Sequence, residues 1–404
     1  MARSLFQALT RLQGAWKPLS FINTNFTRIP LNQLVEEETL PDYVATTVWL
    51  ARDLKGRQHV ALKLFIHSRS MGSQLDDEIN MYKRMEGASK RHPGRDAVRT
   101  LLDTFDLDGP AGEHRCLVHT PLWDSVLTFL YRNPVRRLPE PVLAGILQRV
   151  FLALDFLHTE CKIVHADIKA DNIMFGIEDD SVFSHFEQEE LRDPCPRKEV
   201  DGRTIYTSRQ LRMPKRWGAP VLCDFGSAMP GDRENWDKIQ PDIYRAPEVI
   251  LEAPWTYSAD MWNVGCMIWD IFEGGHLFTG KDPELKTYKS RAHLAEMVAL
   301  LGPPPATLLA RGKLSDKFFS QDGKSHPSIH DAFNVLYAAY HGELCTDISL
   351  PDRTTLEERE TTLAGQDKAS FLRLVRKLLA WEPAERGTPN ELMDDEWILK
   401  HTRE

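Results

Sequence analysis

Apolar and polar residues alternate along His59–Phe65, a period of two that predicts a β-strand with one buried face. Farther along the chain, apolar residues recur at intervals of three and four, which predicts buried helices. One such stretch lies between Pro141 and His158 and another between Phe371 and Leu379. Ile79, Tyr82 and Met85 have the same spacing, so we expect the neighbouring Glu78 to project from a helix.

Two short polar segments stand out against this apolar pattern. Residues 165–172 read His-Ala-Asp-Ile-Lys-Ala-Asp-Asn, and residues 224–226 read Asp-Phe-Gly after the β-like run Ala219–Cys223. Transfer of a phosphoryl group from ATP to a hydroxyl requires a carboxylate that orients the hydroxyl, cations near the phosphates and oxygen ligands for magnesium. In this order along the chain, the two segments indicate phosphoryl-transfer chemistry.

A third segment supplies a cation and its partner. Val60-Ala-Leu-Lys63 has the form of the lysine-bearing strand of protein kinases, V-A-I-K. A buried ammonium group needs a carboxylate, and Glu78 is the expected partner. Seen alone, Lys63 and Glu78 would be read as a solvated surface pair, but the two downstream loops favour the functional interpretation.

These motifs and the segments after them resemble a eukaryotic protein kinase of the CMGC group, with the SR-protein kinases as the nearest subfamily. The resemblance covers residues 46–400. It is carried by the activation-segment end Tyr244–Glu248, the following helix Ser258–Cys266, the group insert His293–Pro305 and the C-terminal helices Phe371–Trp397, in which Arg386 is expected to pair with Glu248.

The resemblance implies an α+β, bilobal protein kinase fold with a small β-rich N-lobe and a large helical C-lobe. The expected organisation is an N-terminal extension at 1–45, the N-lobe and hinge at 46–122, and the C-lobe at 123–400. An inserted segment is expected at about 176–218, because residues 178–202 are rich in acids whereas 203–217 carry only basic charges. Docking, localisation and a tolerated loop are the roles open to it.

The resemblance also assigns roles to individual residues, with ATP and Mg²⁺ as cofactors. The catalytic residues would be Asp167, which accepts the hydroxyl proton, and Lys169, which neutralises the transferred phosphoryl group; Asn172 and Asp224 would hold Mg²⁺. ATP itself would contact Lys63, oriented by Glu78, together with Val48, Ala61, Thr120 and Leu122, and His119 would take the gatekeeper position.

The chain departs from the kinase pattern where the glycine-rich loop should lie. Its glycine positions read Pro41, Tyr43 and Thr46, and no glycine occurs between Gly14 and Gly56. The first strand and the loop therefore look deleted near Ala45–Thr46, and a splice variant, a gene-model error and a pseudokinase all fit. Two hypotheses follow: an active serine/threonine kinase, or a catalytically weak or inactive kinase-fold protein that binds partners.

A second departure is Ala166, which replaces the arginine that normally pairs with a phosphorylated activation segment. SR-protein kinases also lack this arginine and are constitutively active as a class. We therefore expect any activity to be independent of activation-segment phosphorylation.

The amino-acid composition bears on the expected partners and cellular location of the protein. The net charge of −9 disfavours nucleic acid as a direct partner. It suits basic protein substrates, which for the resembling subfamily are Arg-Ser-rich, but charge alone equally fits a solvated acidic surface. We expect no membrane association, because no apolar run is long enough to span a bilayer, and a monomer, since no heptad repeat is present. The subfamily implies a cytoplasmic and nuclear protein. The alternative is mitochondrial, because residues 1–35 contain no acid and resemble a transit peptide. A disordered extension is the other interpretation of this segment.

Overall fold

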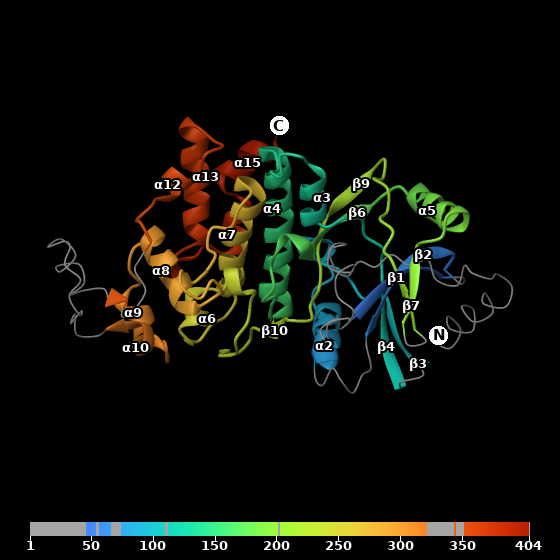
Figure 1. Cartoon of the computed structure of the whole chain (residues 1–404), viewed down its shortest axis with the longest axis horizontal. Coiled ribbons are helices and arrows are strands. Elements are labelled where there is room, and N and C mark those ends of the chain that lie inside the picture. The colour runs from blue at the N-terminus through green and yellow to red at the C-terminus, as the bar shows by residue number, and fades with distance from the viewer. Residues whose placement is uncertain are drawn as a thin grey trace. The chain divides into compact units, whose positions relative to one another are not determined.

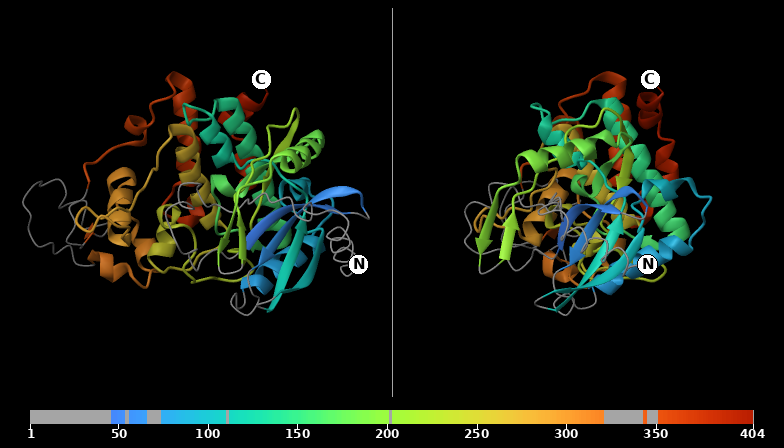
Figure 2. Two further views of the ribbon diagram at one scale, coloured as in Figure 1. Left: turned by 45° about the vertical axis from the view of Figure 1, so that its right-hand side comes forward. Right: turned by 90° about the vertical axis from the view of Figure 1, so that its right-hand side faces the viewer.

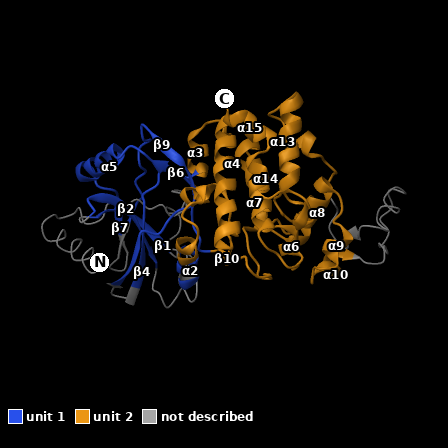
Figure 3. Ribbon diagram, turned by 180° about the vertical axis from the view of Figure 1, so that it is seen from behind, with its two compact units in different colours: residues 1–82, 98–125, 174–226 blue, residues 83–97, 126–173, 227–404 orange. Residues whose placement is uncertain are grey.

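The computed structural model describes residues 46–53, 56–65, 74–109, 112–200, 203–320, 343–344 and 351–403. The predicted extension at 1–45 and the transit-like pattern in it lie outside these residues. The chain forms two compact units (Figure 3). Unit 1 comprises residues 1–82, 98–125 and 174–226, and unit 2 comprises residues 83–97, 126–173 and 227–404. Each unit is described by itself, and the predicted lobe boundaries stay a prediction.

Unit 1 is built on a four-stranded antiparallel sheet in the order β1-β2-β4-β3 (Figure 1). The strands are β1 (Thr46–Asp53), β2 (Gln58–Phe65), β3 (Asp103–Gly109) and β4 (Gly112–His119). The predicted alternation in β2 is present: Val60 and Leu62 join Phe105, Cys116 and Val118 in a core cluster on one face. The first part of helix α2 (Gln74–Gly87) also belongs to this unit.

The predicted insert folds within unit 1. Strands β6 (Ile173–Ile177) and β9 (Trp217–Leu222) pair with each other and flank it. Between them lie helix α5 (Ser181–Arg192) and the antiparallel hairpin of β7 (Arg197–Val200) and β8 (Arg203–Tyr206), seen beside β1 and β2 in Figure 2. The insert has its own buried residues, Val182, Phe183, Phe186, Cys195 and Leu211, so it is an ordered part of the unit.

Unit 2 is helical around four central helices: α4 (Glu140–Asp155), α7 (Ser258–Glu273), α13 (Gly365–Leu378) and α15 (Glu396–Thr402). Their aromatic side chains form the core, with ring centroids 4.9 Å apart for Phe272 and Phe371 and 5.2 Å apart for Phe371 and Trp397. The predicted buried pair of Arg386 and Glu248 is confirmed, with N–O distances of 2.6 and 2.7 Å.

Shorter elements complete unit 2. They are α3 (Val126–Arg132), β5 (Ile163–Val164), β10 (Met229–Pro230), α6 (Pro247–Ile250), α8 (Ser290–Leu301), α9 (Ala306–Leu309), α10 (Ser315–Phe318), β11 (Phe319–Ser320), β12 (Glu343–Leu344), α12 (Leu356–Arg359) and α14 (Pro389–Met393).

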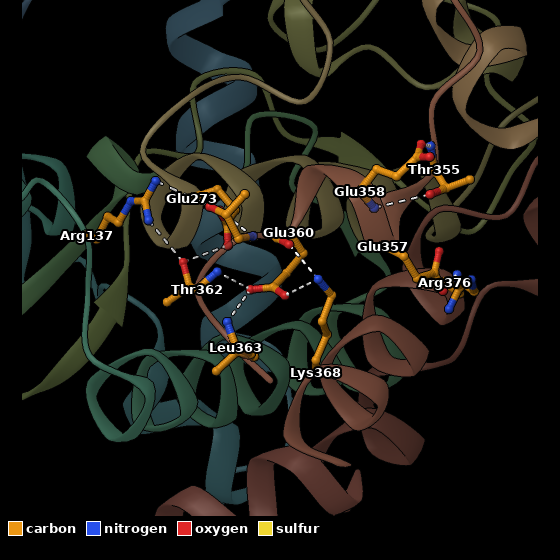
Figure 4. Close-up of polar contacts among 11 residues, drawn as sticks. Arg137, Glu273, Thr355, Glu357, Glu358, Glu360, Thr362, Leu363, Lys368 and Arg376 are labelled. Atoms are coloured by element: carbon orange, nitrogen blue, oxygen red, sulfur yellow. Dashed lines mark hydrogen bonds and ion pairs between the residues drawn. The ribbon is translucent and has the colours of Figure 1, made fainter. Parts of the chain in front are cut away.

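A polar cluster joins the end of α7 to the linker between α12 and α13 (Figure 4). Glu360 accepts hydrogen bonds from the main-chain N–H groups of Thr362 (2.7 Å) and Leu363 (2.6 Å), and it pairs with Lys368 at 3.2 Å. The Thr362 hydroxyl bonds to Glu273 at 3.0 Å. We call these five residues the linker cluster.

One helical stretch corrects an expectation from the sequence. Among the described residues, Glu140–Cys161 is the one helix with the length and apolar composition of a membrane span, so the expectation that no run reaches this length is wrong. Of its most apolar window, 61% is buried inside the protein. Burial in the core accounts for the apolar composition of this helix.

Candidate active site

In unit 1, the predicted Lys63–Glu78 ion pair is present. Lys63 Nζ lies 2.8 Å from Glu78 Oε1 and 3.0 Å from Oε2, and 3.2 Å from Asp224 Oδ1. Glu78 is 2% exposed and Asp224 is 49% exposed. The Glu78 carboxylate therefore pairs with the ammonium group in the protein interior, whereas the Asp224 carboxylate faces solvent. Burial alone would lower the pKa of Lys63, but attraction by Asp224 and Glu78 outweighs it and raises the pKa. Lys63 therefore stays positively charged at neutral pH.

Strand register places the predicted ATP contacts on one face of the sheet. Val48 lies opposite Lys63 in the β1–β2 pair, and Ala61 lies opposite His119 in the β2–β4 pair. Residues directly opposite each other, and those two positions apart along a strand, project from the same face. Val48, Ala61, Lys63 and His119 therefore share a face. In the segment after β4, Leu122 is buried and Thr120 is exposed.

Contacts with Thr100 and with Tyr82 fix the predicted gatekeeper His119. Its Nδ1–H donates to the Thr100 carbonyl at 2.9 Å, and its ring lies 5.4 Å from the ring of Tyr82 on α2. Tyr82 in turn makes an edge contact with Phe225 at 5.4 Å. Burial lowers the pKa of His119 well below its usual value, so the imidazole is neutral. These aromatic contacts connect strand β4, helix α2 and the Asp-Phe-Gly segment within unit 1.

In unit 2, the loop 165–172 holds Asp167 by both carboxylate oxygens. Lys169 Nζ lies 2.6 Å from Oδ1, and the Asn172 side-chain amide donates to Oδ2 at 2.8 Å and to the Asp167 carbonyl at 2.8 Å. The Asn172 nitrogen donates both bonds, so its amide oxygen takes no part in them. The structure thus brings together the three predicted loop residues Asp167, Lys169 and Asn172.

Asp260 positions this loop, and the sequence interpretation assigned it no role. It is fully buried on α7 and accepts hydrogen bonds from the N–H groups of His165 and Ala166, both at 2.8 Å, and from His158 at 2.9 Å. These bonds fix the loop where Ala166 adopts a left-handed conformation with φ of 64°. The available signal was an acid inside the apolar helix pattern of Ser258–Cys266, since a buried acid needs partners.

Each unit contains an oxygen donor of the type that can bind Mg²⁺ together with phosphate oxygens. Among the described residues, no group of three or more His, Cys, Asp or Glu side chains is arranged to hold a metal. Mg²⁺ prefers oxygen ligands and is commonly bound through one or two protein groups plus substrate phosphates. The half-exposed Asp224 carboxylate in unit 1 and the oriented Asn172 amide in unit 2 are oxygen donors of this type.

Comparisons with known proteins agree with this chemistry. A protein kinase domain model matches residues 209–398. The chain is 38% identical to a serine/threonine protein kinase of Aspergillus fumigatus, over 88% of this chain and 81% of the relative. It is 29% identical to the serine/threonine-protein kinase SRPK of Physarum polycephalum, over 69% of each chain, and 25% identical to the protein kinase dsk1 of Schizosaccharomyces pombe, over 75% of this chain and 73% of that one. The chain therefore belongs to the serine/threonine protein kinases, with SR-protein kinases of the CMGC group among its relatives.

Proposed function

We propose that this kinase transfers the γ-phosphate of ATP, with Mg²⁺, to serine or threonine hydroxyls in Arg-Ser-rich proteins. The observation that carries the proposal is the fixed Asp167 carboxylate, held by Lys169 on one oxygen and Asn172 on the other. A carboxylate held in this way can accept a hydrogen bond from a substrate hydroxyl and orient it toward phosphorus.

The predicted site residues have separate roles in proton transfer, charge neutralisation, ATP binding and Mg²⁺ binding. Asp167 takes the hydroxyl proton late in the transfer, and Lys169 neutralises charge on the transferred group. Lys63, oriented by Glu78, binds the α- and β-phosphates, while Val48, Ala61, Thr120 and Leu122 surround the adenine. Asn172 and Asp224 would hold Mg²⁺, which when bound neutralises charge on the phosphate oxygens.

The Arg-Ser preference has three supports. The motifs resemble the SR-protein kinases, one relative is named SRPK, and the net charge of −9 attracts cationic segments. Arginine differs from lysine because its planar guanidinium group forms paired hydrogen bonds with carboxylates. A preference for arginine over lysine at equal charge is therefore a specific consequence of the proposal.

The alternative of an inactive kinase-fold binding protein is not favoured. It arose from the missing glycine-rich loop, and residues 41–45 lie outside the described part of the chain. What supports activity is the charged Lys63 in contact with Glu78 and the complete Asp167 loop. A chain that had lost its chemistry would have no need to keep both arrangements.

The test is transfer of labelled phosphate from Mg-ATP to an Arg-Ser-repeat peptide, with a Lys-Ser peptide of equal charge for comparison. Asp167→Asn serves as the blank, since it keeps the shape of the side chain but not its basicity. We expect this variant to lose at least about a hundredfold in rate and to retain nucleotide binding. Transfer by the unaltered chain no faster than the blank would reject the proposed activity. Equal rates on both peptides would reject the arginine preference alone.

A further inference from the structure

The insert makes direct contact with the strands that carry the predicted ATP contacts. The Glu187 carboxylate on α5 receives two hydrogen bonds from Arg52, of 3.1 Å from Nε and 2.5 Å from Nη2. Its Oε1 also lies 2.9 Å from His59 Nε2. Arg52 on β1 and His59 on β2 stand directly opposite each other in the strand register. A single carboxylate from the insert therefore joins the two strands.

Apolar contacts reinforce this junction. The Phe183 ring stacks on the His59 ring with centroids 4.7 Å apart, and Phe183 is buried. From the other part of the insert, Tyr206 on β8 makes an edge contact with Trp49 on β1 at 5.7 Å. Glu187 and His59 are only 18% and 15% exposed, so their contact is shielded from solvent on most sides. Arg52 is 52% exposed, so its pair with Glu187 is open to solvent on the arginine side.

The position of the junction relates it to nucleotide binding. Arg52 is four residues after Val48 on β1, and His59 is two before Ala61 and four before Lys63 on β2. Even spacing along a strand keeps side chains on one face. Glu187 and Phe183 thus contact the same sheet face from which Val48, Ala61 and Lys63 project, whereas Trp49, which contacts Tyr206, is on the opposite face.

We propose that helix α5 of the insert is a positioning element for nucleotide binding, acting through Glu187 and Phe183 on the β1–β2 pair. This deepens the proposed function and rests on it. By joining Arg52 to His59, Glu187 fixes the spacing of the two strands, and so the relative positions of Val48, Ala61 and Lys63. In kinases a glycine-rich loop near the phosphates usually contributes to nucleotide positioning. The insert contacts β1 and β2 at Arg52 and His59, the end of this strand pair that lies away from Thr46 and Phe65.

The direct test is steady-state kinetics of Glu187→Ala, with Glu189→Ala as the matched control. Glu189 lies on the same helix, but it pairs with His185 and Arg212 inside the insert. We expect Glu187→Ala to raise KM for ATP about fivefold, the effect of losing roughly 1 kcal/mol, with kcat and the peptide KM unchanged. The control should keep all three values. An unchanged KM for ATP, or a fall in kcat alone, would overturn the proposal.

Two further measurements separate positioning from general loss of structure. The charge exchange Arg52→Glu with Glu187→Arg should bring KM for ATP back toward its original value, whereas each single change should not. Hydrogen exchange of the nucleotide-free protein should become faster in strands 46–53 and 58–65 of Glu187→Ala, and stay the same in 103–109. Hydrogen exchange that stays unchanged in strands 46–53 and 58–65 of Glu187→Ala would count against the proposal.

Failure of the proposed function remains distinguishable from failure of this inference. If the unaltered chain transfers no phosphate but binds a fluorescent ATP analogue, the dissociation constant of that analogue replaces KM in the comparison of Glu187→Ala with Glu189→Ala. If it binds no analogue, both proposals fail.

Discussion

Burial sets the protonation state of His293, a residue on α8 with no exposed surface. The Tyr288 hydroxyl lies 3.1 Å from His293 Nδ1, and Arg245 Nη1 donates to the same hydroxyl at 3.4 Å. Desolvation, with the nearby positive charge of Arg245, lowers the pKa of His293 to about 3. The folded protein therefore holds this imidazole neutral at pH values where the unfolded chain would protonate it.

This difference predicts a loss of stability in mild acid. Between its unfolded pKa near 6.5 and its folded value, His293 takes up a proton in the unfolded chain only, so the stability it contributes above pH 6.5 is lost as pH falls. At pH 5 the loss is about 2 kcal/mol. Urea unfolding at pH 7 and pH 5 measures it, and His293→Phe should show a smaller decrease. An equal decrease in the free energy of unfolding of both proteins would show that His293 is not the cause of the acid sensitivity.

Single residues also show where sequence interpretation succeeds. The Lys63–Glu78 and Glu248–Arg386 pairs were predictable, since both follow from motif positions and both are present. Asp260 was not, because an acid in a helical pattern does not reveal which distant N–H groups it accepts from. Its bonds to the loop at 165–166 join residues about 95 positions apart, a separation that local periodicity cannot bridge.

At the level of elements, side chains and backbone groups of unit 2 hold the middle of the activation segment, which runs from Asp224 to Glu248. Asp232 pairs with Arg84 at 3.2 Å, Asn235 and Trp255 exchange backbone hydrogen bonds, and Lys313 lies 3.9 Å from the centre of the Trp236 ring. Within this segment the hydroxyl side chains are Ser227 and Tyr244. Tyr244 is buried and donates to Asp270 at 2.5 Å, which leaves Ser227 as the accessible hydroxyl.

Activity should therefore survive removal of phosphate. Phosphatase treatment, and the variant Ser227→Ala, should leave the rate of peptide phosphorylation unchanged, because carboxylates and aromatic contacts already order the segment. The measurement is the initial rate before and after treatment, with mass spectrometry to show that Ser227 carries no phosphate. A large fall in rate after treatment would show that a phosphorylated residue is required.

The linker cluster predicts an effect on stability without an effect on chemistry. Glu360 is 1% exposed, and its carboxylate satisfies two main-chain N–H groups and Lys368. Glu360→Ala leaves the two main-chain N–H groups without their acceptor and removes the carboxylate beside Lys368, and it should lower the free energy of unfolding by about 3 kcal/mol. Denaturant unfolding measures the loss, and the surface variant Glu357→Ala, which removes a half-exposed pair with Arg376, should cost less than 1 kcal/mol. Equal losses would contradict the predicted role of burial.

Elements with strong periodicity were predictable from the sequence, whereas the structure and contacts of the insert were not. Strand β2 and helices α4 and α13 carry apolar positions at regular spacing, and each is present near its expected range. The insert showed only segregated charge, which indicates a surface segment but not its contacts. The structure explains the segregation: Glu189 and Glu190 of the acidic half pair with Arg212 and Arg209 of the basic half. What the charges could not show is that α5 also packs on β1 and β2.

For the whole molecule, the charge distribution bears on how substrates arrive. The chain has 50 basic and 59 acidic residues, and removing the four basic residues among the first 35 positions, which contain no acids, leaves 46 against 59, a balance of −13. A field of this sign attracts cationic segments and raises their local concentration. The monomeric state, the absence of nucleic-acid binding and the cytoplasmic and nuclear location stay predictions.

Salt should therefore weaken the use of basic substrates. Raising ionic strength from about 0.05 M to about 0.3 M shortens the screening length from roughly 14 Å to roughly 6 Å, so the KM of an Arg-Ser peptide should rise several-fold while kcat changes little. The rise should be steeper for an eight-repeat peptide than for a four-repeat peptide, since attraction scales with peptide charge. Sucrose at matched osmolality controls for solvent effects without screening. A KM that is insensitive to salt for both peptides would show that recognition rests on local contacts rather than on the overall acidic field.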